Sequence, residues 1–462
     1  MGAFLFIAAV VIEIALAFFS IKTRSPQQKT RDMVRVAAFV GFVLLCALSI
    51  VDWGVTYYAF AGLLLLLALI GGVRFIVRGK RLRGKRRPPK AFKPARVVWK
   101  AVGMTGLILV VALPAILFPL YPSIETTGPY RVATATYTYT DSNRVETYTN
   151  TGEKRKLNVE LWYPELADAE AVVSTDANVE ANAYSGAGVK QTFPLIVFSH
   201  GSFGVKSSNE SLYLELASHG YVVCSIDHTY QAMYTTDDKG HTTRIDSGFM
   251  KEISKEDAHN NKPQSVAFYQ KWMNIRTGDI KFVIDHIKDE TQNTNADSVY
   301  KLVDSTKIGV MGHSLGGSAA LGIGRMRQDV GAVIALESPF MYDIEGVKDG
   351  EFVFNGQKYP VPVLNVYSDS SWGHLSEWPQ YKENYAMLTD PPANAFNVHI
   401  KGVGHLSLTD FALTSPILTW VLNGKISTTS TEYCLKTINK VCLEFFDSYL
   451  KGEGQFTAGG EY

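Results

Sequence analysis

The sequence predicts an α/β domain, with a mostly parallel sheet flanked by helices, preceded by about four transmembrane helices. Short, uniformly apolar runs alternate with helical stretches through the larger C-terminal part, as a parallel sheet covered on both faces requires. Long apolar runs fill the N-terminal part. A Gly-x-Ser-x-Gly pentapeptide, residues 312–316, follows one of the short apolar runs and marks a candidate catalytic site.

Residues 1–122 are expected to form a membrane domain. Each of their apolar runs is near the length that crosses a bilayer; the runs are Ala3–Ile21, Val36–Val51, Val55–Val77 and Ala101–Tyr121. No basic residue precedes the first run, so it does not read as a cleavable signal peptide.

The charges between the runs predict the orientation. Residues 22–35 and 78–100 are rich in Lys and Arg, whereas Asp52–Gly54 has no basic residue. Because basic connections stay in the cytoplasm, we expect a multi-pass cell-membrane protein whose domain after Tyr121 faces outward. The basic segment is expected to anchor on membrane lipid. Since the net charge is only +1, no nucleic-acid partner is expected.

One ionisable residue, Glu13, lies in the middle of the first run, and no basic residue lies at mid-depth in the other runs. A hydrogen bond between helices and a proton-linked role both remain open. No cofactor and no metal site are expected, because the spacing of the four cysteines fits no ligand set.

The outer domain is expected to span residues 123–462. Its first strands, near Arg131–Thr140 and Leu157–Pro164, alternate in polarity as half-exposed antiparallel strands do. Shorter apolar strands are expected near residues 195, 222, 308, 332, 362 and 397, with helices such as Glu210–Ser218 and Lys271–Lys288 between them. The polar segment Ala167–Gln191 is expected to be a surface loop. Gln231–Pro263 is either a lid over the site or an ordinary exposed loop.

The pentapeptide around Ser314 fits the nucleophile elbow of the α/β-hydrolase fold, since the buried strand Lys307–Met311 leads into it and a helix follows. Another apolar strand runs into His200-Gly201, where an oxyanion loop belongs, and Gly402–His405 places a histidine in a glycine-rich loop after the last expected strand. Nucleophile, acid and histidine then follow the chain order of this fold.

The segments PLIVFSHG and ELASHGYVVCSIDHTY, within Pro194–Tyr230, resemble the plasma-type platelet-activating factor acetylhydrolases and their bacterial relatives. GVMGHSLGG, from Gly309 to Gly317, resembles the elbow of the same family. The resemblance covers about Leu157–Asp410. It implies phospholipids or other esters with a short or oxidised acyl chain as substrates, cleaved without calcium.

Ser314 is the expected nucleophile and His405 its general base, while His200, His228 and His313 read as structural histidines. The backbone N–H of Leu315, directly after the nucleophile, is one expected oxyanion donor. The resemblance implies that Ser202, just after His-Gly, supplies the other.

Two residues compete for the acid of the triad. Asp369 follows the later strand, where many α/β-hydrolases carry the acid, and Glu337 follows the earlier one. The resemblance favours Glu337, because the acetylhydrolases carry their acid after the earlier strand, although theirs is usually Asp. Asp369 remains the alternative.

The expected function is that of a membrane-anchored serine esterase, which cleaves acyl esters or phospholipid-like substrates through a Ser-His-acid triad. Two alternatives stay open: a peptidase or acyltransferase of the same fold, and a catalytically inactive, membrane-anchored binding protein.

Overall fold

The structure is a computed structural model that describes residues 2–48, 54, 57–81, 92–166 and 191–462. Contacts divide the chain into two compact units, Met1–Pro122 with Thr414–Leu418, and Ser123–Leu413 with Thr419–Tyr462. The segment Ala167–Gln191, expected to be a surface loop, lies outside the described residues except for Gln191.

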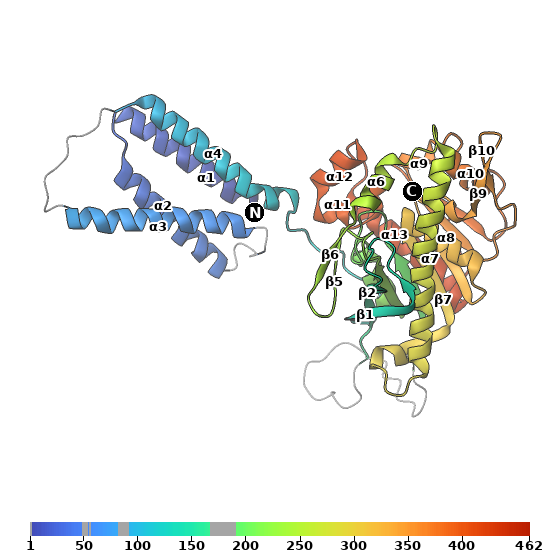
Figure 1. Cartoon of the computed structure of the whole chain (residues 1–462). Coiled ribbons are helices and arrows are strands. Elements are labelled where there is room, and N and C mark those ends of the chain that lie inside the picture. Colours follow the sequence, from blue (N-terminus) through green and yellow to red (C-terminus); the bar gives the residue numbers. More distant parts are fainter. Residues whose placement is uncertain (1, 49–53, 55–56, 82–91, 167–190) are drawn as a thin grey trace. The chain divides into compact units, whose positions relative to one another are not determined.

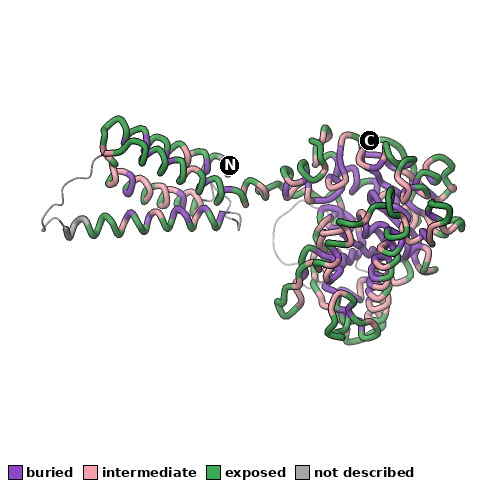
Figure 2. Tube along the Cα trace, turned by 45° about the horizontal axis from the view of Figure 1, so that its top comes forward, coloured by how far each residue is buried: buried purple, intermediate pink, exposed green. Residues whose placement is uncertain are grey.

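The first unit contains four long helices: α1 (Gly2–Lys22), α2 (Gln28–Ala47), α3 (Tyr58–Arg81) and α4 (Pro94–Leu117). Among the described helices, α1, α3 and α4 are long and apolar enough to cross a membrane. About four such helices were expected. The fourth, α2, does not qualify, because charged residues occupy its first half. Much of the surface of these helices is exposed (Figure 2).

The buried carboxylate of Glu13 has a partner that the apolar runs did not reveal. Arg35, just before the second run, donates from Nε and Nη2 to Glu13 Oε1 at 3.0 and 2.8 Å. Arg31 lies 3.8 Å from the other oxygen, and Asp32 of the same helix lies 3.5 Å from Arg74 of α3. Glu13 therefore sits in an ion-pair network, which is the pairing that a buried charge requires.

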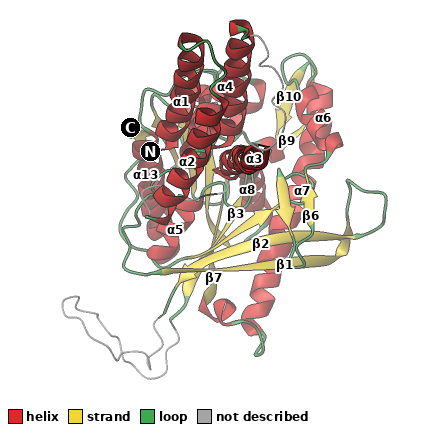
Figure 3. Ribbon diagram, turned by 90° about the vertical axis from the view of Figure 1, so that its left-hand side faces the viewer, coloured by secondary structure: helices red, strands yellow, loops and turns green. Residues whose placement is uncertain are grey.

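The second unit is built on a nine-stranded sheet in the order β1-β2-β4-β3-β7-β8-β11-β12-β13. Figure 1 labels β1, β2 and β7 of this sheet. Strands β1 and β2 pair antiparallel at one edge, and β2 also runs antiparallel to β4. The remaining neighbours are parallel. The expected edge strands and parallel core strands are confirmed, and Figure 3 shows β1 and β2 side by side at that edge.

The strands of this sheet are β1 (Val132–Val145), β2 (Lys154–Pro164), β3 (Phe193–Ser199), β4 (Val222–Asp227), β7 (Val303–His313), β8 (Val330–Leu336), β11 (Val363–Ser368), β12 (Ala395–Ile400) and β13 (Gly460–Glu461). Two small hairpins are formed by β5 (Tyr234–Thr236) with β6 (Thr242–Arg244), and by β9 (Ile344–Lys348) with β10 (Glu351–Phe354). The main helices are α5 (Glu210–Ser218), α6 (Ser247–Lys255), α7 (Lys262–Gln292), α8 (Leu315–Met326), α10 (Lys382–Thr389) and α13 (Thr431–Phe446). Shorter helices are α9 (Asp369–Trp372), α11 (Phe411–Thr414) and α12 (Pro416–Asn423), and short turns of helix cover Ser298–Leu302, Met341–Asp343, Pro379–Tyr381, His405–Leu408 and Asp447–Lys451.

Two hydrophobic cores cover the two faces of the sheet. In β3, Leu195 and Val197 join the core that includes α7 and α8, whereas Ile196 and Phe198 join the core that includes α5 and α13. Alternate side chains of a strand point to opposite faces, so a strand buried on both faces is apolar throughout. Burial on both faces explains why the sequence of these strands is uniformly apolar. The packed strands also hold in place the loops that carry the candidate site.

Candidate active site

The expected nucleophile lies on a strained turn between β7 and α8. Ser314 has φ 53° and ψ −124°, a conformation that side-chain-bearing residues rarely adopt. Its N–H donates to Leu336 O at 2.8 Å, which ties the turn to the neighbouring strand β8. Strain of this kind persists only where the surroundings over-determine it, and it clusters at functional sites.

Glycines flank this turn because the chain passes close to its neighbours. A Cβ on Gly316 would lie 2.0 Å from Ser199 O, and one on Gly312 would lie 2.4 Å from the carbonyl carbon of Gly316. A Cβ on Gly201, in the loop after β3, would lie 2.9 Å from a ring nitrogen of His313. The loop after β3 and the elbow can therefore approach one another only with glycine at these positions.

Five of the six residues expected at the site line one pocket, with a volume of about 320 Å³. They are Ser202, Ser314, Leu315, Glu337 and His405; Asp369 is not among the lining residues. The rest of the wall is mostly apolar and aromatic, formed by Ile253, Glu256, Trp272, Pro339, Met341, Ser370, Trp378, Gln380 and Tyr381.

His405 begins a short helical turn after the glycine-rich loop. Its N–H donates to Ser370 Oγ at 3.0 Å, and its ring lies 4.6 Å from the ring of His313, centre to centre. Within the described part of the chain, no hydrogen bond joins the His405 ring to Ser314 or Glu337. Such bonds are often long without substrate and tighten when it binds, so their absence here does not exclude His405 as the base.

The two candidate acids differ in their free hydrogen-bonding capacity. Glu337 is buried, its Oε2 accepts from Ser368 N at 2.9 Å, and its Oε1 has no hydrogen-bond partner among the described residues. In Asp369, by contrast, one oxygen lies 2.9 Å from His399 Nε2 and the other accepts from Gly402 N at 3.0 Å. Of the two acids, only Glu337 has a buried oxygen that can still accept a hydrogen bond. Its backbone is also strained, with φ at 50° as in the turn at Ser314.

Both residues expected to donate to the oxyanion line the pocket. Leu315 is the first residue of α8, where a helix offers its backbone N–H no partner. Ser202 follows the tight Gly201 and lines the same pocket. The start of α8 adds the positive end of a helix dipole, which favours a developing negative charge.

The histidines interpreted as structural are held neutral. Burial lowers the pKa of His200 well below its ordinary value, and the Arg276 charge lowers it further. Burial does the same for the pKa of His313, helped by His405, and burial with Arg276 lowers the pKa of His228 to about 3. A permanently neutral ring can fix a loop by hydrogen bonds, but it does not exchange protons near neutral pH.

One buried set has the connectivity of a catalytic triad but no access. Ser199 Oγ lies 2.8 Å from His228 Nε2, and His228 Nδ1 lies 2.8 Å from Asp279 Oδ2. All three residues are 2% exposed or less, and none of them lines the pocket. A substrate cannot reach this serine in the folded domain. Sequence reasoning did not find the set, because Asp279 sits inside helix α7 with no motif around it.

Several wall residues were also missed. Ile253 and Glu256 come from the segment Gln231–Pro263, which therefore contributes to the pocket wall. Trp272 comes from α7, and Trp378 belongs to the segment before α10. No local pattern marks these residues, because only the tertiary fold brings them together.

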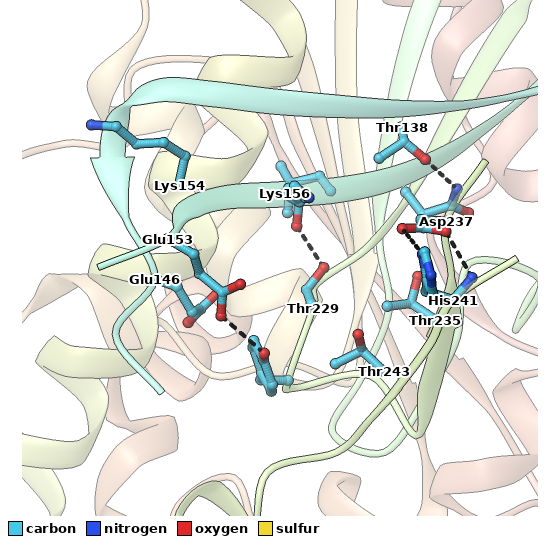
Figure 4. A pocket seen from close by; sticks show the side chains of 13 residues that line it. Thr138, Glu146, Glu153, Lys154, Lys156, Thr229, Thr235, Asp237, His241 and Thr243 are labelled. Carbon is cyan, nitrogen blue, oxygen red and sulfur yellow. Dashed lines mark hydrogen bonds and ion pairs between the residues drawn. The ribbon is translucent and has the colours of Figure 1, made fainter. Parts of the chain in front are cut away.

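A second, polar pocket of about 230 Å³ lies between the β1–β2 edge and the β5–β6 hairpin (Figure 4). None of the residues expected for catalysis lines it. Its Thr229 donates to Lys156 O, and its Glu153 accepts from Tyr230 OH. Both hydrogen bonds join groups that line this pocket to one another.

Comparison with known proteins gives one family match and several relatives. The profile of the family described as "Platelet-activating factor acetylhydrolase, isoform II" matches residues 145–460. The platelet-activating factor acetylhydrolase of Cavia porcellus is 25% identical over 275 residues, which are 56% of this chain and 58% of that protein. That of Canis lupus familiaris is 24% identical over 304 residues, 60% of this chain and 61% of that protein. The chain thus spans about three fifths of the length of these relatives.

Among solved structures, a ferulic acid esterase from Streptomyces cinnamoneus superposes with a TM-score of 0.52 at 22% identity. The superposition covers 74% of this chain and 97% of the esterase. At this identity the likeness shows the fold alone, that of an α/β hydrolase.

Proposed function

This chain belongs to the family described as platelet-activating factor acetylhydrolase, isoform II, and from that membership and the pocket at Ser314 we propose that it is a serine hydrolase of carboxylic esters. Ser314 is the nucleophile, His405 the general base and Glu337 the acid. The observation that carries the proposal is the pocket itself. It brings a strained serine, a histidine and a buried carboxylate with a free oxygen to one cavity.

The proposed reaction needs no metal. His405 takes the proton of Ser314 Oγ as that oxygen attacks the ester carbonyl carbon, and Glu337 orients the ring and stabilises its positive charge. The carbonyl oxygen becomes an oxyanion that the N–H groups of Leu315 and Ser202 stabilise, each by about 3 kcal/mol. When the tetrahedral intermediate collapses, the alcohol leaves with the proton from His405. A water molecule then gives its proton to His405 and attacks the carbonyl carbon of the acyl-enzyme. The second intermediate collapses, His405 returns the proton to Ser314 Oγ, and the carboxylic acid is released.

The pocket favours a compact, apolar acyl group. Its wall is mostly aromatic and aliphatic, and the lining includes the acidic residues Glu256 and Glu337 but neither Lys nor Arg. The named relatives act on platelet-activating factor, according to their names. We therefore propose short-chain or phospholipid-like esters as substrates.

We further propose that the protein acts at a membrane. The lengths of α1, α3 and α4 suit a bilayer, and α12 with the loop after it exposes Trp420, Val421, Leu422 and Ile426. An exposed apolar patch of this kind suits contact with lipid. Because residues 78–100 are strongly basic and a single helix, α4, separates them from the outer domain, that domain faces outward whether or not α2 crosses.

The substrate proposal is tested by hydrolysis of glycerophospholipids and nitrophenyl esters of graded acyl length, with the full chain in detergent. We expect turnover to fall steeply beyond a few acyl carbons, and calcium chelation to have no effect. Activity on small esters with no activity on any lipid would contradict the lipid substrate. No hydrolysis and no labelling by a fluorophosphonate would contradict the enzyme itself.

The orientation is tested with cysteines in described, exposed positions. Asn295→Cys, in the outer domain, should react with an impermeant maleimide in intact cells. Lys93→Cys, before α4, should react only after permeabilisation. Three of the four native cysteines are buried, so their background is low. Reversed reactivity would place the domain in the cytoplasm.

A further inference from the structure

The proposed oxyanion hole depends on the orientation of one peptide, the unit that joins Gly201 to Ser202. A trans peptide is planar, so its C=O and N–H point in opposite directions. Gly201 has no side chain to limit its rotation. Whatever holds the Gly201 carbonyl therefore decides whether the Ser202 N–H faces the reacting oxygen.

The Gly201 carbonyl is held by the preceding side chain. His200 Nδ1 lies 2.6 Å from Gly201 O, and the N–H of Gly204 also donates to it, at 3.2 Å. The other ring nitrogen of His200, Nε2, accepts from the backbone N–H of His228 at 3.3 Å. A backbone N–H only donates, so the proton of the neutral ring must be on Nδ1, where it can donate to Gly201.

The His200 carbonyl, one peptide earlier, is held by Arg276 from α7. Arg276 is fully buried, and its Nη1 donates to His200 O while its Nε donates to Gln231 Oε1 at 2.6 Å. Two successive carbonyls of the loop are therefore fixed, one by an arginine and one by a histidine.

The buried Ser199–His228–Asp279 set helps to hold the His200 ring in place. Asp279 accepts from His228 Nδ1 and is bonded by Arg155 at 3.1 and 2.7 Å. His228 is thereby held where its backbone N–H meets the His200 ring. A path of hydrogen bonds then runs from Asp279 in α7 through His228 and His200 to the Gly201–Ser202 peptide.

We propose that His200 is a positioning residue that turns the Gly201–Ser202 peptide so that the Ser202 N–H faces the substrate carbonyl, with Arg276 holding the loop behind it. This inference rests on the proposed function. It gives the buried triad-like set a role, which is to hold the oxyanion loop and not to react.

The test compares an ester with its thionoester, in which sulfur replaces the carbonyl oxygen. Sulfur is a weak hydrogen-bond acceptor, so the wild-type protein should prefer the ester strongly. In His200→Leu, kcat for the ester should fall up to about 100-fold with little change in KM, because one oxyanion donor is turned away. The ester-to-thionoester ratio should fall toward one. The ratio is measured within one preparation, so a partly unfolded fraction does not affect it.

Arg276→Met is the second variant, and it decides the matter if His200→Leu does not fold. It should lower the same ratio by loosening the His200 carbonyl. His241→Leu, an exposed histidine on the β5–β6 hairpin, is the control and should keep the wild-type ratio. An unchanged ratio in a folded His200→Leu or, in its absence, Arg276→Met would overturn the inference. A wild-type protein that hydrolyses neither substrate would instead overturn the proposed function.

Discussion

Two serine–histidine–carboxylate sets lie in the described part of the same domain. One is fully hydrogen-bonded but buried, and the other lines a pocket but is not fully hydrogen-bonded. Ser199, His228 and Asp279 form an unbroken hydrogen-bonded chain, yet they are fully buried or nearly so. The set at Ser314 lines a pocket, yet among the described residues no hydrogen bond joins its histidine ring to Ser314 or Glu337. Complete bonding is what stability requires of buried polar groups. A catalytic set instead needs access to substrate and polar atoms that are free to form new hydrogen bonds during the reaction.

The local backbone produces this difference. Ser199 ends the regular strand β3, so its side chain stays within the layer between sheet and helices. Ser314 sits at a positive φ on a turn, so its side chain leaves the layer and reaches the pocket. The glycines of the elbow make this possible because they remove the Cβ atoms that would collide.

The largest expected effect comes from the accessible serine. Ser314→Ala should lower kcat by a factor on the order of 10⁶, because a triad without its nucleophile retains only binding and oxyanion stabilisation. Labelling by a fluorophosphonate should vanish while the thermal midpoint stays close to wild type. Ser298→Ala, an exposed serine, is the control and should label normally. Persistent labelling of Ser314→Ala would place the nucleophile elsewhere.

The acids give the next effect. Glu337→Gln should lower kcat by about 10⁴-fold, since the imidazole loses the partner that orients it. Asp369→Asn should cost less than about tenfold, because Asp369 holds the Gly402 backbone and His399, and so reaches His405 only through its loop. Steady-state kinetics of both variants decide between them. The reverse ranking would make Asp369 the acid and leave the free oxygen of Glu337 unexplained.

These residues also show how far the sequence could go. The elbow, the parallel strands and the glycine-rich loop at His405 follow from local patterns, and the structure confirms the strands and brings Ser314, His405 and Glu337 to one pocket. The choice between Glu337 and Asp369 could not be made by pattern, because both follow strands and differ only in their tertiary hydrogen bonds. Trp272 lines the pocket and Arg276 binds the His200 carbonyl, yet both lie within one long helix. No local sequence pattern there distinguishes such residues from ordinary core residues. In the first unit, the partner of Glu13 came from outside the apolar runs.

Acid should destabilise the domain through the buried rings. His200, His228 and His313 have folded pKa values below the ordinary value of 6.5, that of His228 being about 3. Below pH 6.5 the unfolded chain therefore binds more protons, and stability falls with pH by about 1.4 kcal/mol per unit for each ring. Carboxyls whose pKa values burial raises act in the opposite direction: Asp410, with a pKa of about 6, and Glu160, Glu210, Asp227, Asp343 and Glu383. An unfolded Asp or Glu titrates at about pH 4, so these carboxyls act mainly at the lower end of the range, whereas the rings act from pH 6.5 downward.

Thermal unfolding of the full chain in detergent, followed by tryptophan fluorescence, measures this dependence. We expect the midpoint to fall between pH 7 and 5. His228→Gln, which removes one titrating ring, should make the dependence shallower. A midpoint that is flat or rises on acidification would show that the rings are protonated in the folded state, and that the buried set is not sealed.

The smallest effect is expected at the sealed serine. Because His228 donates from Nδ1 to Asp279, its Nε2 must accept, so the Ser199 hydroxyl is the donor between them. Ser199→Ala leaves that buried nitrogen without a partner and should cost about 2 kcal/mol of stability, with kcat within a few-fold of wild type. The matched control is Ser225→Ala, which removes another buried strand serine whose hydroxyl donates to Lys206 O. If both variants lose similar stability and keep their turnover, the hydrogen bonds of the buried Ser199–His228–Asp279 set stabilise the fold and take no part in catalysis. If folded Ser199→Ala lost turnover as Ser314→Ala does, substrate would have to reach the buried set, and the division between the two sets would fail.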